Sequence, residues 1–422
     1  MRFFNTHHPG NSLYRETLAY AFTKALPGVT GLLSVILFFR LAGPVEYGRF
    51  SLLFTFANMC SAFSFGWLSQ AILRYYSRVN DQNHFLTIAA KGFALSGVFC
   101  ILLITILQWF SFPRDSSALM VIALTIMIGG FSLSNVFFQA RQQPLMVVKL
   151  TSLQGFLSVV LPVTFMLVFT KGHTSIIWGF ALAYALPVLL VFKHINSGIV
   201  EKISSNKQNQ LFSFFNYGWP LSFWFVANIS LRFLDRLFIE KFLDTSTMGS
   251  YASFVDLITR IFSLIIFPIT MALHPRIMNL WNTNNIKGAL ITLKKGLKYQ
   301  LVIFTICLMV FCFFDQQIFN IIIRLIPEID LSLKPALIPI LIGGFLWQFA
   351  LLIHKPLELS EKSGIMLMGI LVSVLVNITG NIIFLPVYGI MATAYTMVAS
   401  GSVYIIFTVL FAGDLMKKIK EI

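Results

Sequence analysis

Long apolar runs alternate with short polar segments along the whole chain of 422 residues. Each run has about 20 mostly apolar residues, the length that a helix needs to cross a membrane. Twelve such runs lie at 17–39, 50–72, 88–110, 118–139, 146–169, 174–192, 212–238, 248–272, 299–319, 335–353, 364–384 and 388–412. The pattern therefore predicts an all-α, polytopic membrane protein of twelve transmembrane helices, with both termini on the same side.

The composition supports this class and excludes others. Apolar residues make up 57% of the chain and charged residues 11%, against about 25% charged residues in an ordinary soluble domain. A soluble globule could not hide this much apolar surface from water, and disordered chains have the opposite composition. The four cysteines lie inside apolar runs, where they behave as small hydrophobic residues rather than as a disulfide framework: Cys60, Cys100, Cys307 and Cys312.

The net charge of +15 is distributed as membrane topology requires, without the dense patch that is typical of nucleic-acid binding. Of the 31 Lys and Arg residues, 20 lie on the side of the N-terminus, seven on the opposite side and four within the runs. Cytoplasmic loops of membrane proteins carry an excess of Lys and Arg. We therefore expect both termini in the cytoplasm and no nucleic acid among the partners.

The twelve runs divide into two sets of six. We expect an N-terminal six-helix bundle over residues 1–193, a cytoplasmic linker at 194–211, a C-terminal six-helix bundle over 212–412 and a cytoplasmic tail at 413–422. Pro27 and Arg40 match Pro220 and Arg236 at offsets of 193 and 196 residues, which indicates a parallel pseudo-repeat with a site between the halves. The inner loop at 273–298 mixes Leu and Trp with Lys, and this predicts a helix lying on the cytoplasmic face.

Ionisable residues within the runs indicate where the function lies, because each is costly in hydrocarbon and must face protein or water. They are Lys24, Arg232, Asp235, Arg236, Asp256 and Arg260, which sum to +2. An excess of positive charge in a low-dielectric cavity implies an anionic substrate, and arginine favours bidentate contacts with phosphate or carboxylate. With one arginine at the outer mouth and one at the inner mouth, the expected substrate-binding residues are Lys24, Arg40, Arg74, Arg232, Arg236 and Arg260.

Two interpretations of the aspartates remain open. Asp235 lies within one helical turn of Arg232 and Arg236, and pairing there would only balance charge and keep the arginines in place. Asp256 lies one turn from Arg260 in the same way. Alternatively, one aspartate couples transport to a proton or sodium gradient.

No other cofactor is expected, because the sequence has neither a metal-ligand spacing nor a phosphate-binding loop. No nucleophile elbow or paired carboxylate appears either, so we expect that the chain is not an enzyme and binds no metal or ATP. Asn377 and Asn381, one turn apart in the eleventh run, are interpreted as hydrogen-bonding partners between helices.

Several short motifs, in order along both halves, resemble those of the Wzx-type polysaccharide flippases. Residues 41–48 (LAGPVEYG) are similar to the LGP-x-EYG turn after the first helix of that family, and 73–76 (LRYY) to the end of its second helix. Residues 217–221 (YGWPL), 235–236 (DR) and 249–251 (GSY) resemble its seventh and eighth helices. Residues 386–394 (PVYGIMATA) match its P-x-[YF]-G-I-x-G-A-A segment in part, since Met391 replaces a glycine.

The resemblance implies a V-shaped pair of six-helix bundles in the bacterial inner membrane, within the multidrug/oligosaccharidyl-lipid/polysaccharide exporter superfamily. It implies that the chain moves an undecaprenyl-diphosphate-linked oligosaccharide from the cytoplasmic to the periplasmic leaflet, by alternating access, for O-antigen, lipopolysaccharide or capsule assembly. Polysaccharide polymerase or assembly proteins would be partners beside the bilayer. The lipid II flippases of the superfamily carry two further helices, which the twelve runs do not provide.

Two other functions fit a polytopic chain less well. A drug or small-molecule exporter of the same fold predicts an acidic cavity, whereas the charges within these runs sum to +2. A polysaccharide polymerase needs a sizeable outer loop to work on the sugar, and the longest outer loop expected here is 315–334. A flippase for an anionic lipid-linked oligosaccharide is therefore the hypothesis that the sequence favours.

Overall fold

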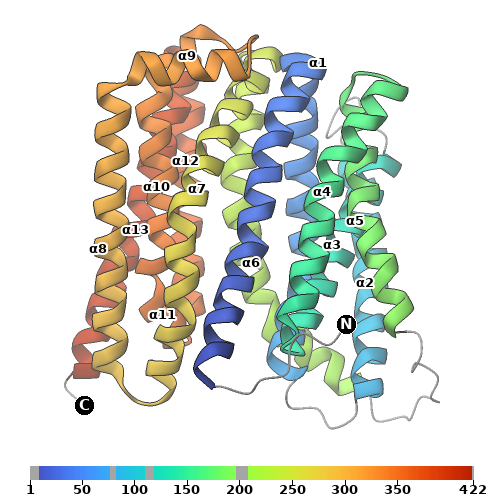
Figure 1. The fold of residues 1–422 in the computed structure, drawn as a ribbon, viewed down its shortest axis with the longest axis vertical. Helices are drawn as coiled ribbons and strands as arrows, with labels where there is room; N and C mark the ends of the chain where they lie inside the picture. The colour runs from blue at the N-terminus through green and yellow to red at the C-terminus, as the bar shows by residue number, and fades with distance from the viewer. Residues whose placement is uncertain (1–8, 77–81, 110–117, 196–207, 421–422) are drawn as a thin grey trace.

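The computed structural model describes residues 9–76, 82–109, 118–195 and 208–420, which are helical almost throughout and contain no strand. The helices are α1 (Pro9–Tyr75), α2 (Gln82–Trp109), α3 (Ala118–Ala140), α4 (Pro144–Val168), α5 (His173–Ile195), α6 (Gln208–Phe242), α7 (Thr245–Asn282), α8 (Ile286–Phe313), α9 (Asp315–Leu325), η2 (Leu331–Ala336, a 3₁₀ helix), α10 (Leu337–Ile353), α11 (Lys355–Leu359), α12 (Ser363–Tyr388) and α13 (Ile390–Lys420). Helix α1 begins and α13 ends at one end of the molecule, the terminal end, and α9 lies across the other, the α9 end (Figure 1). Ten of the described helices are long and apolar enough to cross a membrane, and the chain is a multi-pass membrane protein.

Helix α1 contains the first two predicted spans, which meet at Gly43. Gly43 has φ of 80° and ψ of 174°, a conformation that residues with a Cβ atom rarely adopt. Pro44 follows and has no N–H to continue a helical ladder. The chain reverses here, so the segments before and after Gly43 cross the molecule separately. The helix count of the prediction is confirmed when α1 is counted as two crossings and α6 is added.

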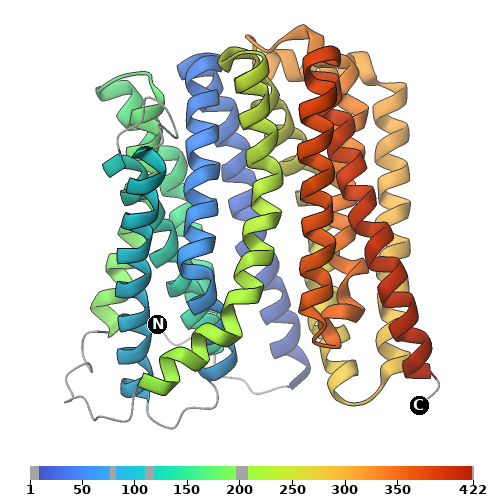
Figure 2. The ribbon, with the colours of Figure 1, turned by 180° about the vertical axis from the view of Figure 1, so that it is seen from behind.

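Helix α6 is not among the ten helices that length and apolar composition alone identify. Its apolar pattern is interrupted by Asn228, Arg232, Asp235 and Arg236. It nevertheless runs the height of the molecule between its neighbours (Figure 2) and packs against α1 and α12. Asp235 and Arg236 are buried there, which is how a spanning helix accommodates ionisable residues: they face protein instead of lipid.

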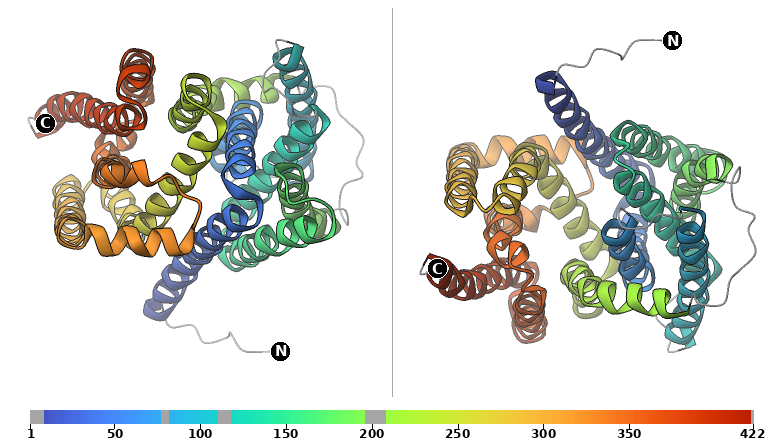
Figure 3. Two further views of the ribbon diagram at one scale, coloured as in Figure 1. Left: turned by 90° about the horizontal axis from the view of Figure 1, so that it is seen from above. Right: turned by 90° about the horizontal axis from the view of Figure 1, so that it is seen from below.

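Helices α1, α6 and α7 form the centre of the molecule, as the two end-on views show (Figure 3). Helix α1 packs against α3 and α4 on one side and against α6 and α7 on the other. Helices α1–α5 form one group of six crossings and α6–α13 the second, in agreement with the predicted fold of two six-helix bundles. The predicted bundle limits at 193 and 211 remain predictions, because residues 196–207 lie outside the described ranges.

The prediction of a helix lying on the cytoplasmic face at 273–298 is wrong. Helix α7 continues to Asn282 and α8 begins at Ile286, so this segment forms the ends of two antiparallel helices. Ile277 and Ala289 are buried in the hairpin, and Trp281 packs against them. The apolar residues that suggested a helix on the membrane surface contact one another instead.

An amphipathic helix lies at the opposite end of the molecule. Helix α9 buries Phe319 and Ile322 in the main core and crosses the bundle ends (Figure 1). The prediction placed its first residues in the span 299–319, whereas α8 ends before them. Asp315, at the start of α9, pairs with Lys334 at 3.1 Å, and the hydrogen bond from Lys334 lowers the pKa of the Asp315 carboxyl from its ordinary value.

Candidate functional site

A cavity of about 300 Å³ lies between the two halves, at the centre of the molecule. Helices α1, α5, α6 and α7 line it. Its apolar wall consists of phenylalanine rings from α1 and α5: Phe38, Phe50, Phe54 and Phe180. Its polar wall holds four of the ionisable residues that the sequence singled out: Arg232, Arg236, Asp256 and Arg260. We refer to this space as the central cavity.

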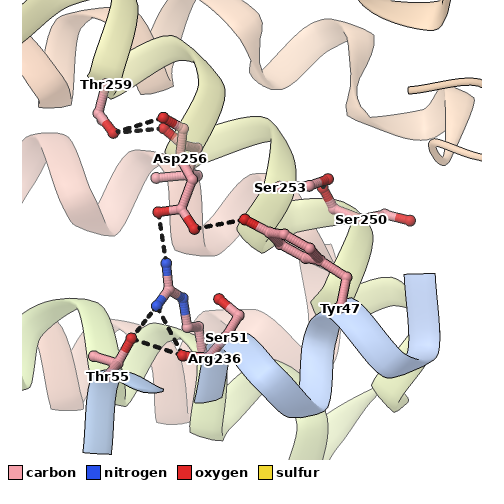
Figure 4. A network of polar contacts seen from close by, with 9 residues as sticks. Tyr47, Ser51, Thr55, Arg236, Ser250, Ser253, Asp256 and Thr259 are labelled. Carbon is pink, nitrogen blue, oxygen red and sulfur yellow. Dashed lines mark hydrogen bonds and ion pairs between the residues drawn. The ribbon is translucent and has the colours of Figure 1, made fainter. Parts of the chain in front are cut away.

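An ion pair between α6 and α7 ties the polar wall of the central cavity to α1. Arg236 Nη2 lies 2.7 Å from Asp256 Oδ1, and Arg236 Nη1 donates to the Thr55 hydroxyl and, at 3.2 Å, to the Ser51 carbonyl oxygen. The Tyr47 hydroxyl donates to the other carboxylate oxygen of Asp256 at 3.0 Å. Figure 4 shows the Arg236 guanidinium between the Asp256 carboxylate of α7 and the Ser51 and Thr55 groups of α1. The pair therefore links the two halves.

The partners of the two aspartates are not the arginines one turn away on the same helix. One of the two interpretations paired Asp256 with Arg260, one turn away, but Asp256 pairs with Arg236 on another helix. Asp235 has no ion-pair partner within 4.0 Å among the described residues. Its carboxylate accepts hydrogen bonds from the side-chain amides of Asn377 at 2.8 Å and Asn381 at 3.1 Å, both on α12. The prediction that these asparagines form interhelical hydrogen bonds is confirmed.

Asp235 borders a second, smaller cavity of about 110 Å³, which lies within the second half of the chain. Its lining includes Asn377 from α12 and Gln348 from α10. Tyr251 and Gln348 also line this space, and neither the Tyr251 hydroxyl nor the Gln348 side-chain carbonyl oxygen has a hydrogen-bond partner in the described part of the chain. We refer to it as the second cavity.

Arg232 and Arg260 have neither a hydrogen-bond acceptor nor an ion-pair partner among the residues whose side chains are described. Arg232 lines both cavities and is exposed, so its exposed surface faces these internal spaces. Arg260 is half-buried on the wall of the central cavity. The guanidinium groups therefore offer unused donors to whatever enters the cavity.

The site has a positive balance. The five described ionisable residues at the two cavities are three arginines and two aspartates, which leaves a net charge of +1 when all are ionised. The sum of +2 from the sequence also included Lys24, whose side chain lies outside the described residues. A cavity with this balance attracts anions, because charges interact more strongly in a low-dielectric interior than in water.

Two of the six predicted substrate-binding residues do not line the central cavity. Arg40, at the α9 end, donates to the Leu325 carbonyl oxygen at 2.7 Å and to that of Arg324, so it caps the last turn of α9. Arg74, at the terminal end, lies over the Tyr217 ring with its Cζ atom 4.2 Å from the ring centroid. The structure brings together Arg232, Arg236 and Arg260 of the predicted set.

Several polar groups of the central cavity were missed by the sequence analysis. Tyr47, Ser51 and Thr55 contribute through the second segment of α1, and Asn228 lines both cavities one turn before Arg232. Uncharged residues do not stand out within an apolar run. Tyr47 was visible as part of the EYG motif, but nothing in that motif indicated that its hydroxyl reaches α7.

Comparison with known proteins identifies the family of the chain. Residues 14–281, more than half of its length, match the model of the family described as polysaccharide biosynthesis protein. The chain is 23% identical over 244 residues to the uncharacterized membrane protein MJ1068 of Methanocaldococcus jannaschii, which covers 56% of this chain. It spans about half, 47%, of the length of that relative.

Solved structures share the fold at low sequence identity. The lipid II flippase MurJ, in an inward closed conformation, matches with a TM-score of 0.72 and 15% identity over 94% of this chain and 87% of that one. An outward-facing multidrug resistance MATE family transporter of the MOP superfamily matches with a TM-score of 0.67 and 13% identity over 99% and 100%. A MOP superfamily transporter from Pyrococcus furiosus, described as having reverse polarity of its binding pocket, matches with a TM-score of 0.60 and 14% identity over 98% and 100%. The chain thus belongs to the polysaccharide biosynthesis protein family, and it shares its fold with MATE family transporters and MurJ.

Proposed function

We propose that this protein is a Wzx-type flippase that moves an undecaprenyl-diphosphate-linked oligosaccharide across the membrane. The observation that carries the proposal is a central cavity of net positive charge, between the two halves, with two arginines that lack partners among the described residues. The family description, polysaccharide biosynthesis protein, agrees with a substrate that carries sugars. The products would serve O-antigen, lipopolysaccharide or capsule assembly.

A diphosphate suits the donors of the central cavity. Arg232 and Arg260 can each hold a phosphate through two parallel N–H···O bonds, which are stronger than bonds between neutral groups. Arg236 already has a carboxylate partner in Asp256. Its role is therefore to add positive potential to the central cavity and to hold α6, α7 and α1 together at the polar wall. The phenylalanine rings on the opposite wall offer flat apolar surfaces for a sugar unit, while the polyprenyl chain stays in lipid.

The direction of transport follows from the proposed topology. With both termini in the cytoplasm of a bacterial inner membrane, the α9 end faces the periplasm. The halves are closely packed at that end, because a Cβ atom on Gly48 of α1 would lie 2.9 Å from the Cα atom of Gly249 on α7. Arg40 also bonds to the carbonyl oxygens at the end of α9. Transport to the periplasmic leaflet by alternating access requires these contacts to separate.

The two aspartates have different proposed roles. Asp256 balances Arg236, whereas Asp235 accepts hydrogen bonds from two amides and borders the second cavity, whose lining residues Tyr251 and Gln348 each carry an oxygen atom without a hydrogen-bond partner in the described residues. A proton or a sodium ion can bind at the Asp235 carboxylate in this space, which Arg232 and Arg236 also line. If transport is coupled to an ion gradient, Asp235 is therefore the residue that carries the ion.

Reconstitution tests the proposed function directly. Purified protein in vesicles is supplied with a fluorescent undecaprenyl-diphosphate oligosaccharide, and flipping is followed by accessibility of the label. We expect Arg260→Ala and Arg232→Ala to reduce the initial rate at least about tenfold, the effect of losing a hydrogen bond to a charged group. Arg49→Ala is the matched control, because Arg49 pairs with Glu46 away from the central cavity. Normal rates in both cavity variants, or transport of a lipophilic cation in place of the anionic lipid, would overturn the proposal.

A further inference from the structure

The side chain of Arg260 crosses from one half of the molecule to the other. Arg260 belongs to α7, and its guanidinium lies against the first segment of α1 at Gly31. Helices α1 and α7 pack against each other there. Gly28, one turn earlier on α1, faces Leu264, one turn later on α7, in the same way. Two glycines one turn apart therefore leave a shallow notch in α1, and the α7 side chains fill it.

The notch at Gly31 is occupied by the guanidinium itself. A Cβ atom on Gly31 would overlap Arg260 Nη1 and would lie 2.8 Å from Cζ and 3.5 Å from Nε. Gly31 is buried, and the guanidinium occupies the volume that a side chain at this position would fill. Even the smallest side chain would push the charged group out of this position.

We propose that Gly31 is a positioning residue for substrate binding: its missing side chain leaves the space in which the Arg260 guanidinium lies, against α1 at the wall of the central cavity. The inference rests on the proposed function, in which Arg260 contacts the diphosphate. An arginine side chain has many rotamers, and fixing one before the ligand arrives lowers the entropy cost of binding. Gly31 thus favours one position of the Arg260 side chain and does not itself contact the substrate.

The notch also makes the position of Arg260 depend on conformation. Gly31 and Arg260 lie in different halves, so the notch exists only while α1 and α7 are packed together. When the halves separate, the Arg260 guanidinium loses its contact with α1 at Gly31 and becomes mobile. A ligand that needs an oriented Arg260 thus binds more tightly to the packed state, and a differential affinity of this kind is what an alternating mechanism requires.

A double-mutant cycle tests the inference with the vesicle assay and the same fluorescent undecaprenyl-diphosphate oligosaccharide. The four proteins are wild type, Gly31→Ala, Arg260→Ala and the double variant. We expect Gly31→Ala to raise the KM about five- to tenfold, the effect of misplacing one charged donor, with the rate at saturation largely kept. In the Arg260→Ala background the same change should have no effect. Alanine favours a helix more than glycine does, so loss of folding is not expected.

Gly28→Ala is the matched control, because it meets the flexible end of Leu264 rather than a charged group. It should leave the KM within about twofold of wild type, since the atom it meets is the end of a half-buried side chain, which can turn aside without moving a charged group. An equal rise in KM on Gly31→Ala with and without Arg260 would show a structural role and overturn the inference. So would a normal KM in Gly31→Ala when Arg260→Ala itself raises it. If Arg260→Ala leaves the KM unchanged, Arg260 does not contact the diphosphate and the role of Gly31 is wrong; the proposed function is overturned only if Arg232→Ala also transports normally.

Discussion

The central cavity and the second cavity hold their aspartates in opposite ways. Asp256 pairs with Arg236 and accepts a hydrogen bond from Tyr47 of α1, so it connects both halves of the molecule. Asp235 is bound by Asn377 and Asn381, which belong to the same half. The two carboxylates lie on neighbouring helices but differ in what changes their contacts. Movement between the halves changes the contacts of Asp256, whereas an ion that enters the second cavity changes those of Asp235.

Removing Asp256 should have the largest effect and tests the first part of this comparison. Asp256→Ala leaves the guanidinium of Arg236, which is 6% exposed, without its carboxylate. Breaking a buried pair from one side costs about 3–5 kcal/mol, so we expect a large fall in the thermal stability of the detergent-purified protein. Replacing both partners, by Arg236→Met and Asp256→Leu, should recover most of that stability. A double variant as unstable as the single one would contradict a role for the pair.

Removing the charge of Asp235 tests the second part. Asp235→Asn keeps the size of the side chain and its ability to bond to the α12 amides, so the change in stability should stay near about 1 kcal/mol. Transport should lose its response to a proton or sodium gradient. The measurement is the flipping rate in vesicles with each gradient imposed in turn. An unchanged response to both gradients would leave Asp235 with a structural role alone.

Removing the hydroxyl of Tyr47 sharpens the comparison with a smaller effect. Tyr47→Phe deletes the hydrogen bond to Asp256, worth about 1 kcal/mol, and so weakens one link between the halves. Distances between spin labels on α1 and α9, at the α9 end, should shift towards wider separations. Tyr395→Phe, an exposed tyrosine on α13, is the control and should not change the distribution. Identical distributions in Tyr47→Phe and wild type would mean that this bond does not restrain the halves.

A helix cap outside both cavities gives the smallest expected effect and a baseline for the others. Asp244 accepts hydrogen bonds from the Thr247 backbone and hydroxyl at the start of α7, and these bonds lower the pKa of its carboxyl. Asp244→Ala should cost about 1 kcal/mol. A lowered pKa means that the stabilisation is present at neutral pH and is lost as the pH falls through the folded-state value. Thermal melts of variant and wild type should therefore converge in acid; a constant difference would contradict the cap.

Much of the fold could be predicted from the sequence because a membrane span is a local property. An apolar run of sufficient length identifies a crossing whatever its neighbours are, and this held even at Gly43, where two runs form two crossings that meet at a reversal of the chain. The residues of the helix ends were harder to assign. At 273–298 and at α9, the same mixture of apolar and polar residues fits a hairpin, a surface helix or the end of a span, and tertiary packing decides between them.

The candidate site was predictable in its charges but not in its pairings. Arg232, Arg236 and Arg260 were identified because arginine is rare within a span, and they do meet at one cavity. The partner of Asp256 was missed, because Arg236 is 20 residues away on another helix and spacing within one helix says nothing about it. The notch at Gly31 could not be predicted either, since it depends on which face of α1 meets α7.

The affinity for the lipid-linked oligosaccharide tests the central claim most directly. Binding of undecaprenyl-diphosphate oligosaccharide is measured by native mass spectrometry for wild type, for a variant with Arg232→Gln and Arg260→Gln, and for Arg49→Gln. A cationic cavity that holds the diphosphate predicts a Kd raised at least about tenfold in the cavity variant and unchanged in Arg49→Gln. Equal affinity in all three proteins would contradict the account.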